Sequence, residues 1–122
     1  MIKVKCIFSR ASPEDGKRYL VDLFWPEGLF TRTAQVHHWY RQLGPSYDLQ
    51  RFEFDVANWE HYKRKYSEEI SCNPDIKQIL EEIAAEAKES TVTLLYGNKD
   101  DTHNHALILK EIIDEAHERN DE

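Results

Sequence analysis

The sequence predicts a single α/β domain in which helices pack on a small mixed β-sheet. Two short apolar runs, at residues 19–25 and 91–96, have the length and composition of buried strands. Elsewhere apolar residues recur at intervals of three and four, the period of an amphipathic helix. A chain of 122 residues is long enough for one core, so residues 1–122 are expected to form one domain with a polar C-terminal end from about 117.

The expected strands are residues 2–8, 18–25 and 91–96. The first alternates apolar residues with lysines, which is the pattern of a half-buried strand. The second is apolar on both faces and follows a group of turn-forming residues. The connection between these two strands is too short for a crossover helix, so they either pair antiparallel or lie apart within the sheet.

The expected helices are residues 33–43, 56–71, 74–89 and 102–118. The first depends on the spacing of Val36, Trp39, Tyr40 and Leu43, which fall at i, i+3, i+4 and i+7. The third begins with an asparagine cap followed by Pro74 in the first turn. All four helices are expected to turn an apolar stripe toward the sheet.

Composition limits the partners and the location. The formal net charge is −7, whereas a generic nucleic-acid binder carries a basic surface, so no nucleic-acid partner is expected. No apolar run approaches the ~18 residues of a membrane helix, and the N-terminus lacks the apolar core of a signal peptide, so no membrane association is expected. We expect a cytoplasmic monomer or small homo-oligomer, with Cys6 and Cys72 reduced.

A candidate site lies where the second and third strands end. In open α/β sheets ligands bind at the carboxyl ends of strands, beside helix N-termini. Asp22 lies in an apolar strand and needs a partner, because burying an unpaired carboxylate is costly. The candidate catalytic residues are Asp22 and His105. The candidate ligand-binding residues are Arg10, Arg18, Trp25, Lys99, Asp100 and Asn104.

No metal and no cofactor are expected. His103 and His105 are two positions apart, so a helix does not place both rings on one face. The alternative, a metal site assembled from separate segments, would use Asp100, Asp101, His103 and His37 or His38. The i, i+4 spacing that makes zinc motifs specific is missing, and the sequence has neither a nucleophile motif nor a Gly-rich phosphate loop.

Several short motifs follow one another in a fixed order. They are Asp15-Gly16 with Arg18, Leu20-Val21-Asp22 leading to Trp25-Pro26-x-Gly28-Leu29, Trp39, Leu43-x-Pro45-Ser46, Trp59 with Tyr66, and Thr93-Leu94-Leu95-Tyr96 with Lys99-Asp100 and Asn104-His105-Ala106. From Lys3 to about Ile113 the chain thereby resembles the YeaO-like family of prokaryotic domains of unknown function (DUF488). The resemblance implies a compact cytoplasmic α/β domain and no particular reaction.

The chain also departs from the pattern of that family. Members similar to this chain typically carry Arg where it has Leu23 and Glu27, and Lys near Thr31. Three basic positions around the Trp-Pro-x-Gly loop are therefore missing, and the resemblance implies that binding of an anion is changed or lost.

Two functions from different classes remain open. The first is a noncatalytic or ligand-binding and regulatory protein, with a polar cleft between the Asp22–Gly28 and Lys99–His105 loops and an unknown small molecule or protein as its partner. The alternative is a small-molecule enzyme in which Asp22 orients His105 as acid or base on an anionic or polar substrate. Both functions require the two loops to meet at one end of the sheet.

Overall fold

The computed structural model describes residues 1–51, 56–98 and 100–120 and forms an α/β fold with one sheet. The strands within this part of the chain are β1 (Ile2–Cys6), β2 (Lys17–Leu20), β3 (His38–Trp39) and β4 (Val92–Tyr96). They lie in the order β1-β4-β2-β3, and each neighbouring pair is parallel. The expectation of a mixed, roughly three-stranded sheet is therefore wrong in strand direction and is one strand short.

The first two strands lie apart because β4 is inserted between them, as one of the two sequence-based alternatives proposed. For β2 to run parallel to β1, the connection between them must return along the length of β1, roughly 17 Å, and cross two strand spacings, roughly 10 Å. An extended segment as long as residues 7–16 spans up to roughly 33 Å, so it makes this crossing without a long helix. It contains only one turn of 3-10 helix, η1 (Pro13–Asp15).

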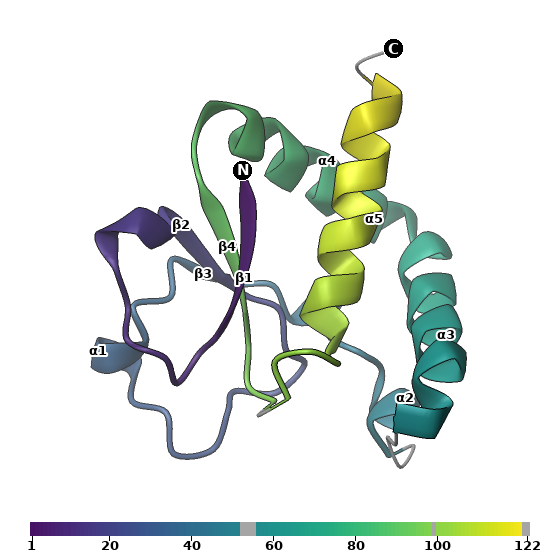
Figure 1. The fold of residues 1–122 in the computed structure, drawn as a ribbon, viewed down its shortest axis with the longest axis horizontal. Helices are drawn as coiled ribbons and strands as arrows, with labels where there is room; N and C mark the ends of the chain where they lie inside the picture. Colours follow the sequence, from purple (N-terminus) through teal and green to yellow (C-terminus); the bar gives the residue numbers. More distant parts are fainter. Residues whose placement is uncertain (52–55, 99, 121–122) are drawn as a thin grey trace.

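Helices cover the two faces of the sheet unequally (Figure 1). The long helices α3 (Trp59–Ser71), α4 (Pro74–Glu89) and α5 (His105–Asn120) pack together on one face. The other face is covered by loops and the short helix α1 (Thr31–Ala34). The remaining elements, between β3 and α3, are η2 (Arg41–Leu43), α2 (Tyr47–Arg51) and η3 (Val56–Asn58). Within the described ranges no helix is long and apolar enough to cross a membrane.

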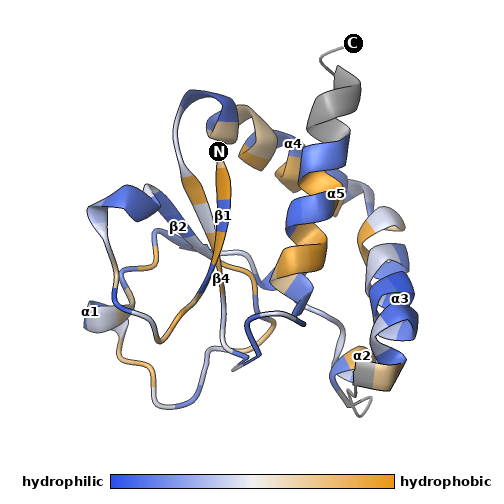
Figure 2. Cartoon of the chain, in the orientation of Figure 1, coloured by the Kyte–Doolittle hydropathy of each residue, from blue (hydrophilic) through white to orange (hydrophobic). Residues whose placement is uncertain are grey.

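Strand alternation divides the core into two clusters. In β4, Val92, Leu94 and Tyr96 belong to the larger cluster, which the three long helices cover. Leu95 points to the opposite face and packs with Leu20 in the smaller cluster. In Figure 2, hydrophobic segments lie in the strands and on α5, whereas α3 is largely hydrophilic.

The helix expected over residues 33–43 is wrong, because most of this segment joins the sheet. Helix α1 ends at Ala34, and Gln35 has a left-handed φ of 47°. The segment that follows pairs with β2, in register with Tyr19 and Leu20, to form β3. The N–H of Tyr40 extends this pairing by donating to the carbonyl of Leu20 at 2.8 Å.

The apolar residues of segment 33–43 are spaced as in a helix because the sheet carries a core cluster on each of its two faces. Val36 and Trp39 pack on the smaller cluster, whereas Tyr40 and Leu43 pack on the larger one. A helix would have placed all four on a single face. Apolar residues that lie on opposite faces of the sheet thus have the same spacing as the apolar stripe of a helix.

The other elements agree with expectation to within a few residues. Helix α4 has the expected bounds, and the Asn73 side chain caps it by accepting from the N–H of Asp75 at 3.0 Å. The helix expected over 56–71 is divided into η3 and α3, and the one expected over 102–118 begins later, at His105. The strands expected over 2–8 and 18–25 end earlier than expected, at Cys6 in β1 and at Leu20 in β2. The strand expected over 91–96 begins one residue later, at Val92 in β4.

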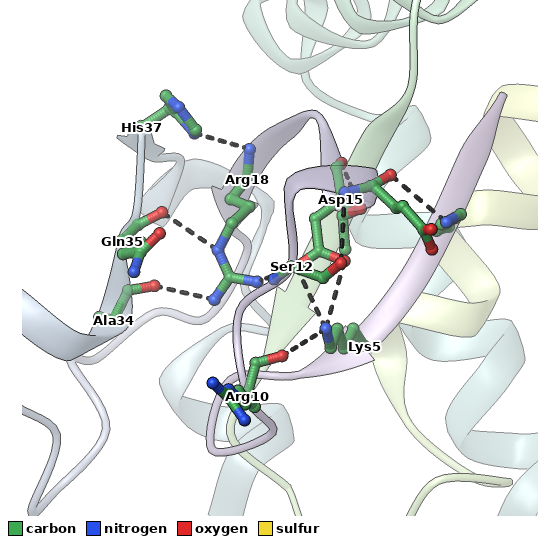
Figure 3. Close-up of polar contacts among 11 residues, drawn as sticks. Lys5, Arg10, Ser12, Asp15, Arg18, Ala34, Gln35 and His37 are labelled. Atoms are coloured by element: carbon green, nitrogen blue, oxygen red, sulfur yellow. Dashed lines mark hydrogen bonds and ion pairs between the residues drawn. The ribbon is translucent and has the colours of Figure 1, made fainter.

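A buried ion pair stabilises the face of the sheet that is covered by loops and α1, which we call the thinly covered face (Figure 3). Asp15 and Arg18 are 3% and 2% exposed. The Asp15 carboxylate accepts from the Arg18 guanidinium at 2.6 Å, from Lys5 Nζ at 3.1 Å and from the backbone N–H of Ser12 at 3.0 Å. The guanidinium also donates to the carbonyls of residues 34–35, at 2.8 and 3.1 Å. This cluster therefore joins β1, η1, β2 and the end of α1.

Burial alone would raise the pKa of the Asp15 carboxyl, but its hydrogen bonds outweigh burial. Donation from the Ser12 N–H, Lys5 and Arg18 holds the pKa below its usual range. Because the folded pKa lies below the unfolded one, the ionised carboxylate stabilises the fold above about pH 4. That contribution is lost as the pH falls through the folded pKa.

We predict that Asp15→Asn lowers the free energy of unfolding by about 3 kcal/mol, because it leaves the buried Arg18 guanidinium without its counter-charge. Urea unfolding at pH 7 measures the loss. The variant should also lose less stability than the wild type when the pH is lowered below about 4. The control is Glu14→Gln, an exposed neighbour in η1. Equal unfolding curves for Asp15→Asn and the control would contradict a stabilising role for the cluster.

Candidate functional site

A cavity of about 720 Å³ opens at the carboxyl edge of the sheet. Phe8, Asp22 and Gly97, which follow β1, β2 and β4, contribute to its lining together with the start of α5. The volume falls within the usual range for small-molecule sites. The two loops singled out in the sequence meet here, which confirms their expected position at one end of the sheet.

Asp22 connects the end of β2 to β4 and α5. Its Oδ2 accepts from the N–H of Gly97 at 2.9 Å, and its Oδ1 lies 3.1 Å from Nε2 of His105. Oδ1 is buried and makes no hydrogen bond among the described residues, so its contact with the His105 ring is one of proximity. Glycine is required at 97 because a Cβ there would lie 2.8 Å from Asp22 Oδ2. The carboxylate is therefore fixed between a backbone amide and an imidazole.

His105 is the first residue of α5, and its ring reaches back to the end of β2. Nε2 also lies 2.9 Å from the backbone carbonyl oxygen of Val21. Because this oxygen and the Asp22 carboxylate only accept, Nε2 must carry the hydrogen. The ring packs edge-on against Tyr66, with centroids 5.7 Å apart. Nδ1 is consequently the ring nitrogen available to a ligand or a proton.

The loop before α5 satisfies its own hydrogen bonds. Asp100 Oδ1 accepts from the N–H and hydroxyl of Thr102, both at 2.9 Å, and from the N–H of His103 at 3.0 Å. These bonds, that from the Thr102 N–H first, hold the pKa of Asp100 below its usual range. Asn104 caps α5 by accepting from the N–H of Leu107 at 3.0 Å, and its amide donates to the Asp100 carbonyl at 3.0 Å. Asn104 therefore caps one N–H of this helix N-terminus, and Asp100 binds two N–H groups of the loop before it.

The structure does not bring all the predicted site residues to the cavity. Trp25 and Asn104 line it, together with the Asp22 and His105 pair. Asp100 supports the loop from outside the lining. The expected contribution of the two arginines is corrected: Arg18 belongs to the Asp15 cluster, and Arg10 lies on the surface, where its carbonyl accepts from Lys5. Lys99 lies outside the described residues.

Aromatic side chains that the sequence analysis did not assign to the site form much of its wall. Phe8, Phe24 and Tyr62 line the cavity beside Trp25. Phe8 and Phe24 are 53% and 51% exposed, which is unusual for large apolar side chains. Their positions just beyond the ends of β1 and β2 were the available signal, because residues at these ends face the crevice. Tyr62 gave no such signal, since its spacing fitted the buried stripe of a helix.

The chain lacks basic residues at three positions where members of the family that it resembles typically carry them. Two of these three positions line the cavity. Leu23 and Glu27 line it, whereas Thr31 begins α1 and lies outside the lining. Gly44 fixes the backbone at Leu23, because a Cβ on this glycine would lie 2.2 Å from the Leu23 nitrogen.

The charged side chains around the cavity are mainly acidic. Asp22 and Glu27 contribute carboxylates, and the lining contains no Lys or Arg in the described part of the chain. Burial first, and then the negative charges of Asp22 and Glu69, raise the pKa of the Tyr62 phenol. Burial and the same carboxylates raise the pKa of Tyr66. The inner end of the cavity therefore lies in a negative potential.

A metal site is not assembled by the residues that the sequence left as an alternative. His103 Nδ1 lies 3.4 Å from Asp100 Oδ2, which is a contact between two side chains of one loop. Within the part of the chain that the structure describes, no group of three or more His, Cys, Asp or Glu side chains is arranged to hold a metal ion. The arrangement instead offers an aromatic wall beside a buried Asp–His pair.

Comparisons with known proteins relate this chain to uncharacterised proteins. Residues 1–122 match the family model described as the inactive DUF488-N3 subclade. The uncharacterized protein YeaO of Escherichia coli (strain K12) is 32% identical over 109 residues, which cover 88% of this chain and 92% of that protein. Uncharacterized proteins of Mycobacterium bovis and Mycobacterium tuberculosis are 24% identical over 113 residues, which cover 92% of each chain.

No solved structure gives a significant match to this chain. The family model nevertheless spans the whole sequence, and the similarity to YeaO spans most of both proteins. The chain therefore belongs to the YeaO-like DUF488 family of uncharacterised proteins.

Proposed function

We propose that this chain is a noncatalytic domain that binds a small molecule in the cavity at the carboxyl edge of its sheet. One observation carries the proposal: the polar groups best suited to acid–base chemistry are used to hold the cavity together. Asp22 binds Gly97 and the His105 ring, and that ring also binds the carbonyl of Val21. Asn104 caps α5. These groups shape a ligand site without requiring a reaction.

The remaining surface of the cavity favours binding over chemistry. Nε2 of His105 carries a hydrogen and cannot act as a general base, so Nδ1 is the only nitrogen of this ring that could accept a substrate proton. The aromatic wall provides apolar area, which is the usual source of affinity in small-molecule sites. The description of the matching subclade as inactive supports the same proposal.

The alternative enzyme has one observation in its favour. Asp22 lies 3.1 Å from Nε2 of His105, and both residues line the cavity. In that arrangement the carboxylate would orient the ring, and Nδ1 would exchange a proton with a polar substrate. Distinguishing the two functions therefore requires a variant that preserves the hydrogen bond of the ring and removes its capacity to titrate.

The class of partner, the cellular location and the oligomeric state are also part of the proposal. The net charge of −7 favours a small molecule or a protein over nucleic acid as the partner. Free Cys6 and Cys72 thiols suit the cytoplasm, and a monomer or small homo-oligomer leaves the cavity open.

We predict that a thermal-shift screen of metabolites finds ligands that bind and are not consumed. A ligand at 100 times its Kd adds about 2.7 kcal/mol to the free energy of unfolding. Each ligand found is then incubated with the protein and followed by NMR. An unchanged ligand spectrum is the expected result, and conversion of the ligand would overturn the noncatalytic proposal.

His105→Gln provides the matched variant for this screen. The glutamine amide retains a donor for the Val21 carbonyl but does not titrate. We expect the variant to bind the same ligands as the wild type. Turnover by the wild type that disappears in this variant would establish the enzyme instead.

We also predict that Asp22→Asn destabilises the fold by about 1–3 kcal/mol whether or not a ligand is present. The asparagine oxygen can still accept from Gly97, but its amide then places a donor against the N–H of the His105 ring. Chemical unfolding measures the effect. Asp101→Asn, an exposed position in the neighbouring loop, is the control and should change stability by less than about 0.5 kcal/mol. Indistinguishable variants would show that the Asp22 contacts do not hold the loops.

A further inference from the structure

The lining of the cavity allows its ligand to be narrowed to a chemical class. Four aromatic side chains, Phe8, Phe24, Trp25 and Tyr62, contribute to one continuous site. Two of them, Phe8 and Phe24, expose about half of their surface, so part of each side chain is accessible to a bound molecule. The faces of aromatic rings carry negative partial charge and attract cations, most strongly in the case of indole.

The charged groups of the lining have the same sign as these ring faces. Glu27 is an exposed carboxylate at the cavity, and Asp22 lies deeper. Glu69 adds a third carboxylate close enough to act on the Tyr62 phenol. No Lys or Arg from the described residues lines the cavity to offset them. A bound anion would meet net repulsion, whereas a bound cation would meet attraction.

The groups that would ordinarily favour an anion are already occupied. Anions bind at helix N-termini through free backbone N–H groups. At α5, however, Asn104 accepts from Leu107, and Asp100 accepts from Thr102 and His103. Lys5 and Arg18 are paired with Asp15 in the cluster that stabilises the second face of the sheet. Among the described residues, these contacts leave fewer groups to attract an anion at the cavity.

We propose that the cavity binds a small organic cation, a molecule with an alkylated or primary ammonium group. This inference rests on the proposed ligand-binding function and specifies its ligand class. The ammonium group lies against the rings of Phe24 and Trp25 with Glu27 as its counter-charge. The apolar part of the molecule lies along Leu23 and Pro26, which also line the cavity.

The test uses three probes of the same shape and different charge. Choline is the cation, 3,3-dimethylbutan-1-ol is its neutral isostere, and 3,3-dimethylbutanoate is an anion of similar size. NMR titration at low salt follows the indole N–H of Trp25, identified by comparison with Trp25→Phe. We expect choline to bind about tenfold more tightly than the alcohol, and the carboxylate more weakly than either.

Two substitutions locate the cation. Glu27→Gln should weaken choline binding about fivefold, whereas Glu81→Gln, the same change on the exposed face of α4, should leave it unaltered. Phe24→Leu keeps an apolar side chain and removes the ring, and should weaken binding about threefold. Both targets are exposed, so the variants should fold. Glu27→Arg should abolish the preference for choline and increase the binding of inorganic phosphate.

The outcomes separate the ligand class from the function. If the alcohol or the carboxylate binds at Trp25 as tightly as choline, the cation class is wrong and the ligand-binding function stands. If none of the three probes binds while the metabolite screen finds another ligand, the cation class is again overturned alone. If neither experiment finds a ligand, both proposals fail. Unchanged choline binding in Glu27→Gln and Phe24→Leu would also overturn the assigned position of the cation.

Discussion

The arrangement of the carboxyl edge depends on one carboxylate, that of Asp22. Its two oxygens connect the residue after β2 to Gly97, which follows β4, and to His105, which begins α5. A buried carboxylate is tolerated only when hydrogen bonds replace the lost water, so this contact requires all three segments to come together. Glycines at 97 and 44 allow the backbone to approach closely enough. The cavity forms where these segments are fixed and the side chains of Phe8 and Phe24 remain outside the core.

The sequence predicted those parts of the fold whose signal was local. Helix α4 was placed correctly because an asparagine cap, Pro74 and a regular apolar stripe all indicated the same start and face. Strand β4 was found because it is apolar on both faces. Residues 33–43 failed because Val36 and Trp39 face one side of the sheet, whereas Tyr40 and Leu43 face the other. That distinction depends on pairing with β2, a long-range contact that leaves no local signal.

The same reasoning explains which site residues were found. Asp22 and His105 were identified because a carboxylate in an apolar strand requires a partner, and the end of a neighbouring strand is where one is available. Arg18 was misplaced because β2 is short and alternates: Arg18 lies on the thinly covered face, where it binds Asp15. Phe8 and Phe24 follow strand ends, which was a signal for the site, but only the fold decides whether a large apolar side chain there is buried or exposed.

The carboxylates of Asp15 and Asp22 are compensated in different ways, and the difference sets the character of the cavity. Asp15 is neutralised by the positive charges of Lys5 and Arg18, so its surroundings carry little net charge from this cluster. Asp22 accepts from the N–H of Gly97 and lies beside the His105 ring, and it is paired with no Lys or Arg of the described residues. After burial, its negative charge contributes to the raised pKa values of Tyr62 and Tyr66. Lys5 of β1 and Arg18 of β2 are paired with Asp15, and no Lys or Arg of the described residues lines the cavity. The carboxyl edge therefore has carboxylates beside an aromatic wall, and these two features together favour a cation there.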